Sequence, residues 1–420
     1  MPREALGGTL VLGGGFAGGY VARLLGRRGA TIVSPENFML YTPMLPEAAS
    51  GTLEPRHVVV PLRMMCPHAE FLLGRGVGID LAHRRVRVET PEGGVFPVVY
   101  RDLVIALGAV SRTLPIPGLA DHGLGFKSLA DAIHLRNHVL RRLEAASEAA
   151  SDAQRRRELT FVFVGAGYAG VEALAELSDL VRDALRYYPS LQSAPQRWIL
   201  VDAAEKILPE IPRRLGDYAA AQLGNRGVEI HTRTTLEAVE PHAVTLSDGN
   251  HVLTSTLVWT AGVRAHPQLS AFDLPLDDRG RVCVDEALRV EGHEHVWALG
   301  DGARVPNRAT PGRFDPPTCQ HALRQARRLA KNLARGESRP YRYRMLGQVA
   351  TLGRYKGIAQ VLNLRFRGFP GWFVTRTYHL YQLPLFSRKL RVDVDWTTSL
   401  FFRRDIAELG MLGHPQRLEA

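Results

Sequence analysis

The spacing Gly-x-Gly-x-x-Gly occurs twice and constrains the fold more than any other feature of the sequence. In each copy an apolar run typical of a β-strand precedes the glycines, and a helix-forming stretch follows them. Glycines at these places let the backbone turn tightly and approach a pyrophosphate, while the amides at the helix start face the anion. One copy is compatible with a plain tight turn, but two copies with the same flanks predict two dinucleotide-binding units. The copies are Gly13, Gly15 and Gly18, and Gly165, Gly167 and Gly170.

The apolar runs around these copies predict an α/β protein whose first domain is interrupted by its second. Strands are expected at residues 9–12 and 30–33 around the first copy, and at residues 160–164 around the second. Residues 103–106 read as a buried strand that leads through Gly108 into a Pro-rich connection, which suits a crossing between domains. Residues 256–263 have the same character and predict the return crossing.

The composition is that of a folded soluble protein with a strong positive charge. In 420 residues, 45% are hydrophobic and 23% are charged, and the formal net charge is +11. Nucleic acid, anionic lipid and phosphate-bearing cofactors all suit that charge. The three cysteines are scattered, so no disulfide framework, metal knuckle or dithiol centre is indicated. The uncharged stretch 5–22 contains the first glycine turn, which argues against a signal peptide or spanning helix, so any membrane contact is expected on one face.

The segment from residue 366 to residue 402 differs from the rest of the chain. It holds ten of the 32 aromatic residues, and the basic residues around it outnumber the acidic ones. Aromatic and basic residues on an amphipathic segment suit a membrane interface, while a helix packed on the core or at a dimer interface is the alternative. On a helical wheel Arg376 lies inside an apolar stripe, so its charge is expected to snorkel to the surface, pair or face a site. The stripe consists of Phe369, Trp372, Phe373, Leu380 and Leu383.

Three positions follow apolar strands where open α/β sheets bind ligands. Asp202 ends the second strand of the second copy, where a carboxylate can take both ribose hydroxyls and would repel a 2′-phosphate, so NADH is favoured over NADPH. The corresponding position of the first copy carries Ser34. Asp301 follows the strand expected at residues 296–299, and an ordinary turn Asp is the alternative reading.

With these pieces in order, the chain resembles the type II NADH:quinone oxidoreductases, flavoproteins with two dinucleotide-binding domains. The segments that carry the resemblance are "GGGFAG", "ALGA", "GAGYAGVE" with "DAAEKILP", "WTAGV", "ALGDGARVP" and "PPTCQHALRQA", followed by the aromatic and basic C-terminal part. The resemblance implies two Rossmann-like domains, FAD on the first copy, NADH on the second, and a quinone reached from the membrane side. The expected domains are FAD-binding residues 1–113 and 264–340, NAD-binding residues 114–263 and a membrane-associating region, residues 341–420.

For the FAD site, the resemblance places the three glycines of the first copy at the pyrophosphate and Asp301 near the ribityl phosphate. Most relatives have an acid where this chain has Ser34, and we expect Glu36, two positions on, to take the role of that acid. Thr42, Gly108, Gly262 and Gln320 complete the expected cofactor-binding residues.

For the reaction, the resemblance points to Glu172, Gln320 and Arg376. Glu172 is expected in the first helical turn at the nicotinamide end, although the helix dipole alone also favours a Glu there. Gln320 is a candidate hydrogen-bond donor to a quinone carbonyl, or an ordinary helix Gln. The family motif AQxAxQ is altered here, with Cys319 for its first Ala and Arg324 for its second Gln. The resemblance places Arg376 near the quinone entrance, facing lipid phosphate or a quinol oxygen.

The expected activity is hydride transfer from NADH to FAD followed by two-electron reduction of a membrane quinone, without proton pumping. No metal site and no nucleic-acid partner are expected, and the protein is placed peripherally on the cytoplasmic face of the cell membrane. A homodimer is left open. A soluble reductase of a ferredoxin-like acidic partner and a catalytically weak nucleotide sensor stay as alternatives. Sulfide:quinone chemistry is disfavoured because cysteines are scarce.

Overall fold

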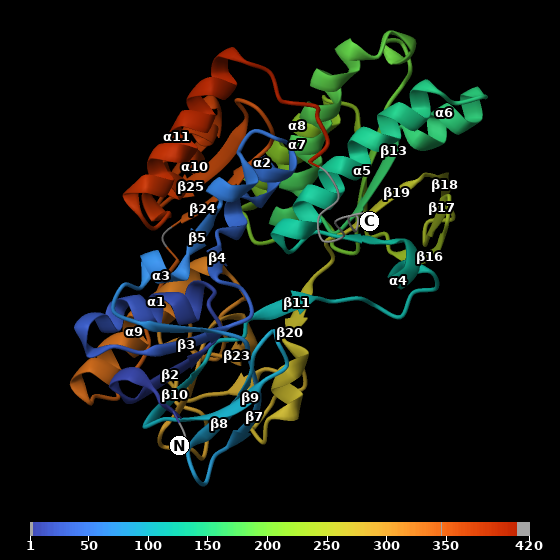
Figure 1. Cartoon of the computed structure of the whole chain (residues 1–420). Helices are drawn as coiled ribbons and strands as arrows, with labels where there is room; N and C mark the ends of the chain where they lie inside the picture. Colours follow the sequence, from blue (N-terminus) through green and yellow to red (C-terminus); the bar gives the residue numbers. More distant parts are fainter. Residues whose placement is uncertain (1–2, 346, 410–420) are drawn as a thin grey trace, which may run out of the picture. The chain divides into compact units, whose positions relative to one another are not determined.

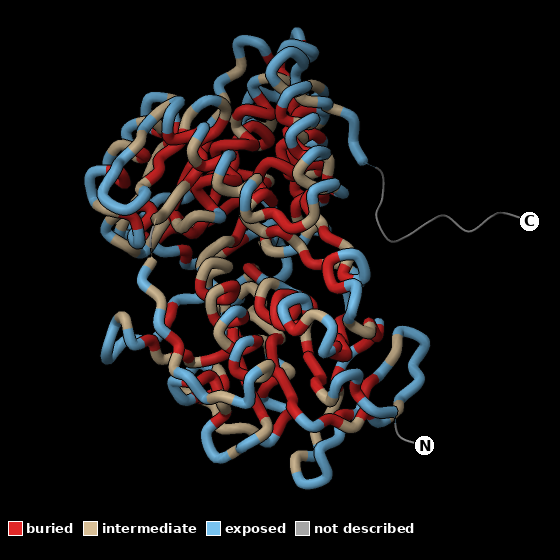
Figure 2. The backbone as a smooth tube through the Cα atoms, turned by 90° about the vertical axis from the view of Figure 1, so that its left-hand side faces the viewer, coloured by how far each residue is buried: buried red, intermediate tan, exposed pale blue. Residues whose placement is uncertain are grey.

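The computed structural model describes residues 3–345 and 347–409 and divides them into two compact units (Figure 1). The first unit contains residues 3–41, 59–110 and 263–345, and the second contains residues 42–58, 111–262 and 347–409. Each unit has a buried interior of its own (Figure 2). The second unit is therefore built from three separate parts of the chain.

The first unit is organised around a five-stranded sheet in the order β22-β10-β2-β3-β6, with every neighbouring pair parallel. Every residue of β2 and β10 is buried, as expected for parallel strands covered on both faces. The first glycine turn follows β2, whose two neighbours in the sheet are β3 and β10. The strands are β22 (Val296–Ala298), β10 (Asp102–Ile105), β2 (Thr9–Leu12), β3 (Thr31–Ser34) and β6 (Glu70–Leu73).

Helices and a second sheet cover the two faces of this parallel sheet. Helix α1 (Phe16–Leu25) contacts β2 and β3 and packs against α9 (Cys319–Arg335). The sheet β1-β9-β8-β7 approaches the parallel sheet where Gly76 leaves room for Leu12, because a Cβ there would lie 3.2 Å from the Leu12 methyl groups. The remaining elements are β1 (Arg3–Glu4), β4 (Phe38–Leu40), β5 (Val59–Pro61), α3 (Leu62–Met65), β7 (Arg75–Asp80), β8 (Arg85–Glu89), β9 (Val95–Val99), β21 (Val282–Cys283) and β23 (Ala303–Arg304).

The second unit repeats the same plan with the parallel order β12-β19-β13-β14-β15. On one face Phe161 stacks on Trp198 with ring centroids 4.3 Å apart, and α7 contacts β13 and β14. On the other face Val162 and Ile199 pack in a cluster with the antiparallel sheet β16-β17-β18. The strands are β12 (Leu124–Gly125), β13 (Thr160–Val164), β14 (Arg197–Asp202), β15 (Val228–Thr232), β16 (Leu236–Glu240), β17 (Ala243–Leu246), β18 (His251–Leu253) and β19 (Thr256–Trp259).

The C-terminal part of the second unit adds a three-stranded antiparallel sheet and two helices. This sheet has the order β24-β25-β26, and α10 packs on β25 where two glycines meet: a Cβ on Gly371 would lie 2.4 Å from the carbonyl oxygen of Gly357. The elements are β24 (Gly347–Thr351), β25 (Gly357–Val361), β26 (Leu364–Gly368), α10 (Phe369–Gln382) and α11 (Phe386–Phe401). The other helices of the unit are α2 (Leu45–Ala49), α4 (Leu119–His122), α5 (Leu129–Ser147), α6 (Asp152–Glu158), α7 (Tyr168–Ala184) and α8 (Arg213–Gly224).

The α/β fold class is confirmed, β2 and β13 have the bounds that the sequence indicates, and β14 ends at Asp202 as expected. The single apolar stripe expected on residues 369–383 is wrong. In α10, Trp372 is buried while Phe369 and Phe373 are more than half exposed, and Leu383 lies beyond the end of the helix. The reason is that β25 occupies one side of α10. Residues 346 and 410–420 of the expected region 341–420 lie outside the described residues.

Two of the places where the chain passes between the units lie at β11 (Ala109–Ser111) and β20 (Val263–Ala265), which pair with each other. Both lie close to the crossings expected from the sequence. No helix in the described part of the chain is long and apolar enough to cross a membrane.

Candidate functional site

The first glycine turn has the shape needed to hold a pyrophosphate. Gly13 has a φ of +106°, and a Cβ there would lie 2.3 Å from the carbonyl oxygen of Ala106. A Cβ on Gly18 would lie 2.0 Å from the carbonyl oxygen of Gly13. Gly15 caps α1, and no atom lies within 4 Å of its missing Cβ. Strain and packing therefore require the first and third glycines, while the second leaves the start of α1 open to an anion.

The second glycine turn repeats these features in the second unit. Gly165 has a φ of +110°, and a Cβ there would lie 2.6 Å from the carbonyl carbon of Thr260. A Cβ on Gly170 would lie 1.9 Å from the carbonyl oxygen of Gly165. Gly167 caps α7 and has open space at its missing Cβ. Each unit thus carries one turn that suits a dinucleotide.

Three further expected cofactor residues lie near the ends of strands or helices. Gly108 follows β10 with a φ of +71°, and its carbonyl accepts a hydrogen bond from the amide of His266 at 3.1 Å. Gly262 lies two residues beyond Thr260, whose hydroxyl donates to the carbonyl of Gly165 at 2.9 Å, so Gly262 is close to the second turn. Thr42 is half-buried and begins the short helix that precedes α2.

Asp202 is held rigidly at the end of β14, beside the second glycine turn. Its Oδ2 accepts a hydrogen bond from the amide of Ala166 at 2.5 Å, and its Oδ1 accepts one from the amide of Ala204 at 2.7 Å. Ala166 belongs to the glycine turn, so the carboxylate is fixed relative to the place where a pyrophosphate would lie. This position suits contact with ribose hydroxyls.

Ser34 occupies the equivalent position of the first unit. It is the last residue of β3, it is buried, and a Cβ on Gly14 would lie 2.9 Å from its Oγ. The amide of Glu36 lies 3.4 Å from the same Oγ, while the side chain of Glu36 is exposed to solvent. The assignment of Glu36 to the ribose stays a prediction.

The turn that carries Asp301 lies next to the first glycine turn. Gly300 has a φ of +77°, and a Cβ there would lie 3.0 Å from the Cβ of Ala17, in the first turn of α1. The amide of Gly300 donates to Oε1 of Gln325 at 2.8 Å. Helix α9 therefore holds the Asp301 turn against the start of α1.

Gln325 was not singled out from the sequence, although it lies beside the departure at Arg324. Its Nε2 donates to Oδ2 of Asp315 at 2.9 Å, so Gln325 links the Gly300 turn to a buried carboxylate. The guanidinium of Arg324 lies 5.2 Å from the ring centroid of Tyr343. The altered motif thus keeps a glutamine, Gln325, which holds the Gly300 turn of the expected flavin site in place.

Gln320 and Cys319 begin α9. Oε1 of Gln320 accepts a hydrogen bond from the hydroxyl of Tyr343 at 3.1 Å, which orients the amide. Burial, with a smaller contribution from the nearby charge of Asp301, raises the pKa of the Cys319 thiol to about 12. Cys319 is therefore a protonated, unreactive thiol at neutral pH.

Glu172 is the fifth residue of α7, just beyond the first turn in which it was expected. Its Oε1 accepts hydrogen bonds from the amide of Thr351 at 2.8 Å and from the hydroxyl of Thr351 at 3.3 Å. Burial raises the pKa of Glu172 to about 8, and the charges of Glu47 and Glu176 add to the shift. The side chain is therefore mostly protonated at neutral pH and can act as a buried proton donor.

Arg376 is buried and paired, so the alternative of a snorkelling surface arginine is wrong. Its Nη2 lies 3.0 Å from Oε1 of Glu47, which belongs to α2. The guanidinium also lies 4.1 Å from the ring centroid of Trp372 and 4.7 Å from that of Trp396. This enclosure leaves Arg376 facing the interior of the second unit.

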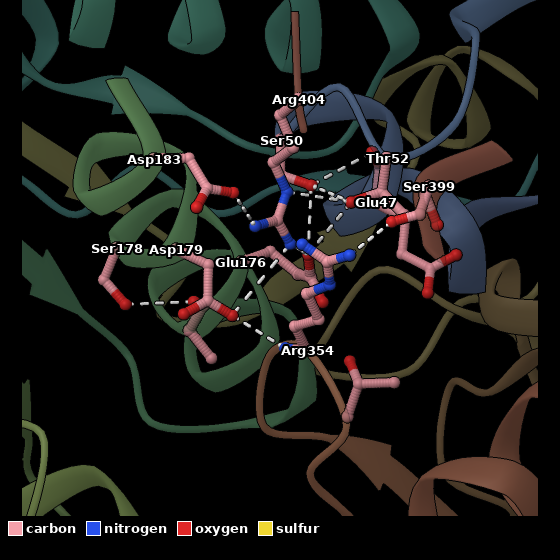
Figure 3. Close-up of polar contacts among 12 residues, drawn as sticks. Glu47, Ser50, Thr52, Glu176, Ser178, Asp179, Asp183, Arg354, Ser399 and Arg404 are labelled. Atoms are coloured by element: carbon pink, nitrogen blue, oxygen red, sulfur yellow. Dashed lines mark hydrogen bonds and ion pairs between the residues drawn. The ribbon is translucent and has the colours of Figure 1, made fainter. Parts of the chain in front are cut away.

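A second buried arginine, Arg404, joins the C-terminal part to α7 (Figure 3). Its guanidinium lies 2.8 Å from Oε2 of Glu176 and 3.2 Å from Oδ2 of Asp183, and it donates to the hydroxyl of Thr52 at 3.0 Å. Burial raises the pKa of Glu176, and Arg404 acts against that shift. Sequence reasoning missed these pairs because their members lie more than 200 residues apart and form no local pattern.

No group of three or more His, Cys, Asp or Glu side chains within residues 3–345 and 347–409 is arranged to hold a metal ion.

The geometry agrees with the proteins that the chain resembles in sequence. The family model of the pyridine nucleotide-disulphide oxidoreductases matches residues 8–326. A probable NADH dehydrogenase from Dictyostelium discoideum is 31% identical over 90% of this chain and 85% of its own length. A type II NADH:quinone oxidoreductase from Mycobacterium tuberculosis is 29% identical over 94% of this chain and 88% of its own length.

Solved structures show the same fold. NDH2 from Plasmodium falciparum, solved with NADH, has a TM-score of 0.88 and 18% identity over 97% of this chain and all of its own. A ferredoxin reductase from Rhodopseudomonas palustris has a TM-score of 0.67 and 22% identity over 84% of this chain and 82% of its own.

The raised pKa of Glu172 predicts a pH dependence of stability. Because the folded protein keeps this proton after the unfolded chain has lost it, the free energy of unfolding falls as pH rises from the unfolded pKa towards 8. Glu172→Gln keeps the acceptor for Thr351 and removes this loss. Between pH 5 and pH 8 the free energy of unfolding of the variant, relative to that of the wild type, should therefore rise by up to about 1.4 kcal/mol per pH unit. Urea unfolding across that range measures the difference, and a constant difference would mean that Glu172 ionises normally.

Proposed function

The chain belongs to the pyridine nucleotide-disulphide oxidoreductase family and, within it, to the type II NADH:quinone oxidoreductases, and we propose that it transfers electrons from NADH to a membrane quinone without pumping protons. The observation that carries this proposal is the pair of glycine turns, one in each unit, in a chain that matches such relatives along almost its whole length. The ferredoxin reductase matches less of the chain. A quinone is therefore favoured over a ferredoxin-like acceptor.

In this proposal the first unit holds FAD. Gly13, Gly15 and Gly18 leave the start of α1 open to the pyrophosphate, and Asp301 is held beside them by Gln325. FAD held there by these residues would supply the redox chemistry that links NADH oxidation to quinone reduction. Glu36 is the candidate contact for the adenosine ribose.

The second unit holds NADH in this proposal. Gly165, Gly167 and Gly170 form its anion site at the start of α7, and Asp202 is the ribose contact. The fixed carboxylate of Asp202 would lie against the 2′-phosphate of NADPH, and the repulsion favours NADH.

Three side chains are proposed to serve the reaction itself. Gln320, oriented by Tyr343, is the candidate hydrogen-bond donor to a quinone carbonyl. Glu172 can hold a proton at neutral pH. Arg376 is proposed as a positioning residue rather than a lipid contact, because it is buried beside Glu47.

The protein is further proposed to lie on the cytoplasmic face of the cell membrane through α10 and α11. Large apolar side chains are exposed on these helices, and four of them share one side of α11 at helical spacing. Arg365, Arg367 and Arg391 are exposed nearby in the sequence and suit an anionic surface. We call the exposed apolar side chains of α10 and α11 the apolar face: Phe369, Phe373, Phe386, Leu390, Val394 and Phe401.

An anaerobic experiment tests the order of the nucleotide sites and the acceptor. Gly165→Val places side-chain atoms against the Thr260 backbone, so the variant should retain FAD while flavin bleaching by NADH slows by about 100-fold or more. Gly224→Val is the control, because no atom lies within 4 Å of its missing Cβ. A short-chain quinone should then restore the yellow colour of reduced wild-type protein.

Loss of FAD in Gly165→Val would mean that the two sites are assigned in the wrong order. Reduced flavin that persists in the presence of quinone would favour the ferredoxin-type alternative.

Vesicle binding tests the apolar face. Phe386→Ser with Phe401→Ser should weaken binding to anionic vesicles by roughly tenfold or more, because two exposed aromatic side chains no longer enter the lipid. Tyr187→Ser with Leu253→Ser changes two side chains that are also more than half exposed but lie outside the face, and this double variant should bind as wild type does. Flotation assays at low and high salt measure both. Equal binding of the two double variants would remove the apolar face from the proposal.

A further inference from the structure

The second unit contains a cavity of about 260 Å³, and Arg376 is the one lining residue that the electron-transfer proposal uses. Its walls come from five places: the loop 51–55 after α2, α5, the turn between β24 and β25, α10, and α11 with the residues that follow it. All of these belong to the second unit.

Basic groups outnumber acidic ones in the cavity wall. Among the described residues, five arginines and three carboxylates line it. Arg376 and Arg404 are already paired with carboxylates of α2 and α7. One of the lining carboxylates, Asp395, accepts hydrogen bonds from His57 and from the amide of Glu54. The remaining arginines, Arg136, Arg354 and Arg403, equal the lining carboxylates in number, so the preference for an anion depends on the donors that lack an acceptor.

Arg136 is the most deeply placed of these arginines. It is 3% exposed, and its Nη2 donates to the backbone carbonyl of Asp405. Its Nη1 is buried and has no hydrogen-bond partner in the described part of the chain. Gly51, with a φ of +72°, brings the loop close, and a Cβ there would lie 3.3 Å from Nη2 of Arg136. A buried guanidinium N–H without an acceptor costs free energy, so a ligand that supplies a hydrogen-bond acceptor at Nη1 of Arg136 would be stabilised here.

A second donor without a partner lines the same cavity. Nε1 of Trp372 is buried, and no described residue accepts its hydrogen. Arg136 comes from α5 and Trp372 from α10, so the two are independent contributions to one wall. Both groups are donors only, so the ligand they suit is an acceptor.

Arg354 is presented to the cavity by a rigid turn. Gly353 has a φ of +89°, and the amide of Arg354 donates to Oδ2 of Asp179 at 2.7 Å. The guanidinium donates to the backbone carbonyl of Ser399 (Figure 3). It also donates to the backbone carbonyl of Leu400. These hydrogen-bond acceptors are neutral carbonyls, so the charge of Arg354 is available to an anion in the cavity.

We propose that this cavity binds a phosphate group. Guanidinium groups match phosphate oxygens in geometry and charge. A phosphate group also offers hydrogen-bond acceptors to Nη1 of Arg136 and Nε1 of Trp372, the two buried donors that lack a partner in the described part of the chain. The charged wall does not suit a quinone ring, for which an apolar lining is typical. Leu400 and Phe402 also line the cavity and are largely exposed, so a phospholipid headgroup could enter with its acyl chains outside. The sources are therefore an anionic phospholipid or free phosphate.

This inference goes beyond electron transfer and does not rest on it. It depends on Arg136, Arg354 and Trp372, none of which is proposed to serve electron transfer, and its test needs no turnover.

The test uses the full-length, FAD-loaded protein, with inorganic phosphate in one arm and phosphatidylglycerol vesicles in the other. In the first arm the melting temperature and the tryptophan fluorescence are followed as potassium phosphate replaces potassium chloride at constant ionic strength. In the second arm flotation with phosphatidylglycerol vesicles is compared with flotation on phosphatidylcholine. The variants are Arg136→Gln and Arg354→Gln. Arg214→Gln is the control, because it removes an exposed charge of α8 that does not line the cavity.

Saturable stabilisation of the wild type by phosphate, weakened about tenfold in Arg354→Gln and unchanged in Arg214→Gln, would identify free phosphate as a ligand. Selective loss of phosphatidylglycerol binding in Arg354→Gln, without a phosphate effect, would identify the headgroup. If Arg136→Gln fails to fold, Arg354→Gln decides alone, because the amide contact of Arg354 with Asp179 does not need its side chain. Behaviour of Arg354→Gln indistinguishable from that of Arg214→Gln in both arms would overturn the proposal.

Discussion

Two buried ion pairs hold the second unit together, and the arrangement of its C-terminal helices depends on them. Glu47 of α2 is neutralised by Arg376 of α10, and Glu176 of α7 by Arg404, which follows α11. A carboxylate buried without its partner is strongly destabilising. The helices that carry the apolar face are therefore part of the folded unit, and removing them would leave two uncompensated charges in its interior.

The local parts of the fold could be predicted from the sequence, because their physical causes are local. Positive φ and close backbone approach at Gly13 and Gly165 leave a glycine pattern that can be read directly. Asp202 and Ser34 were found for a similar reason, since each ends a strand of unmistakable apolar character.

The parts that could not be predicted depend on contacts between distant segments. The helical wheel placed Arg376 inside an apolar stripe and left open whether its charge snorkels, pairs or faces a site, but it could not show that Glu47 and two indole rings surround the guanidinium. Glu47 is 329 residues away from Arg376, and nothing near it in the sequence marks it as a partner. The supporting role of Gln325 likewise depends on the Gly300 turn, which only the folded chain brings to α9.

The central structural claim is that the C-terminal helices are anchored by buried charge, and a double-mutant cycle at Glu47 and Arg376 tests it most directly. Unfolding is followed by circular dichroism in urea for Glu47→Gln, Arg376→Met and the double variant. The account predicts that Arg376→Met alone loses about 3–5 kcal/mol and that the double variant recovers much of this loss. Losses that simply add, or an Arg376→Met variant as stable as the wild type, would contradict it.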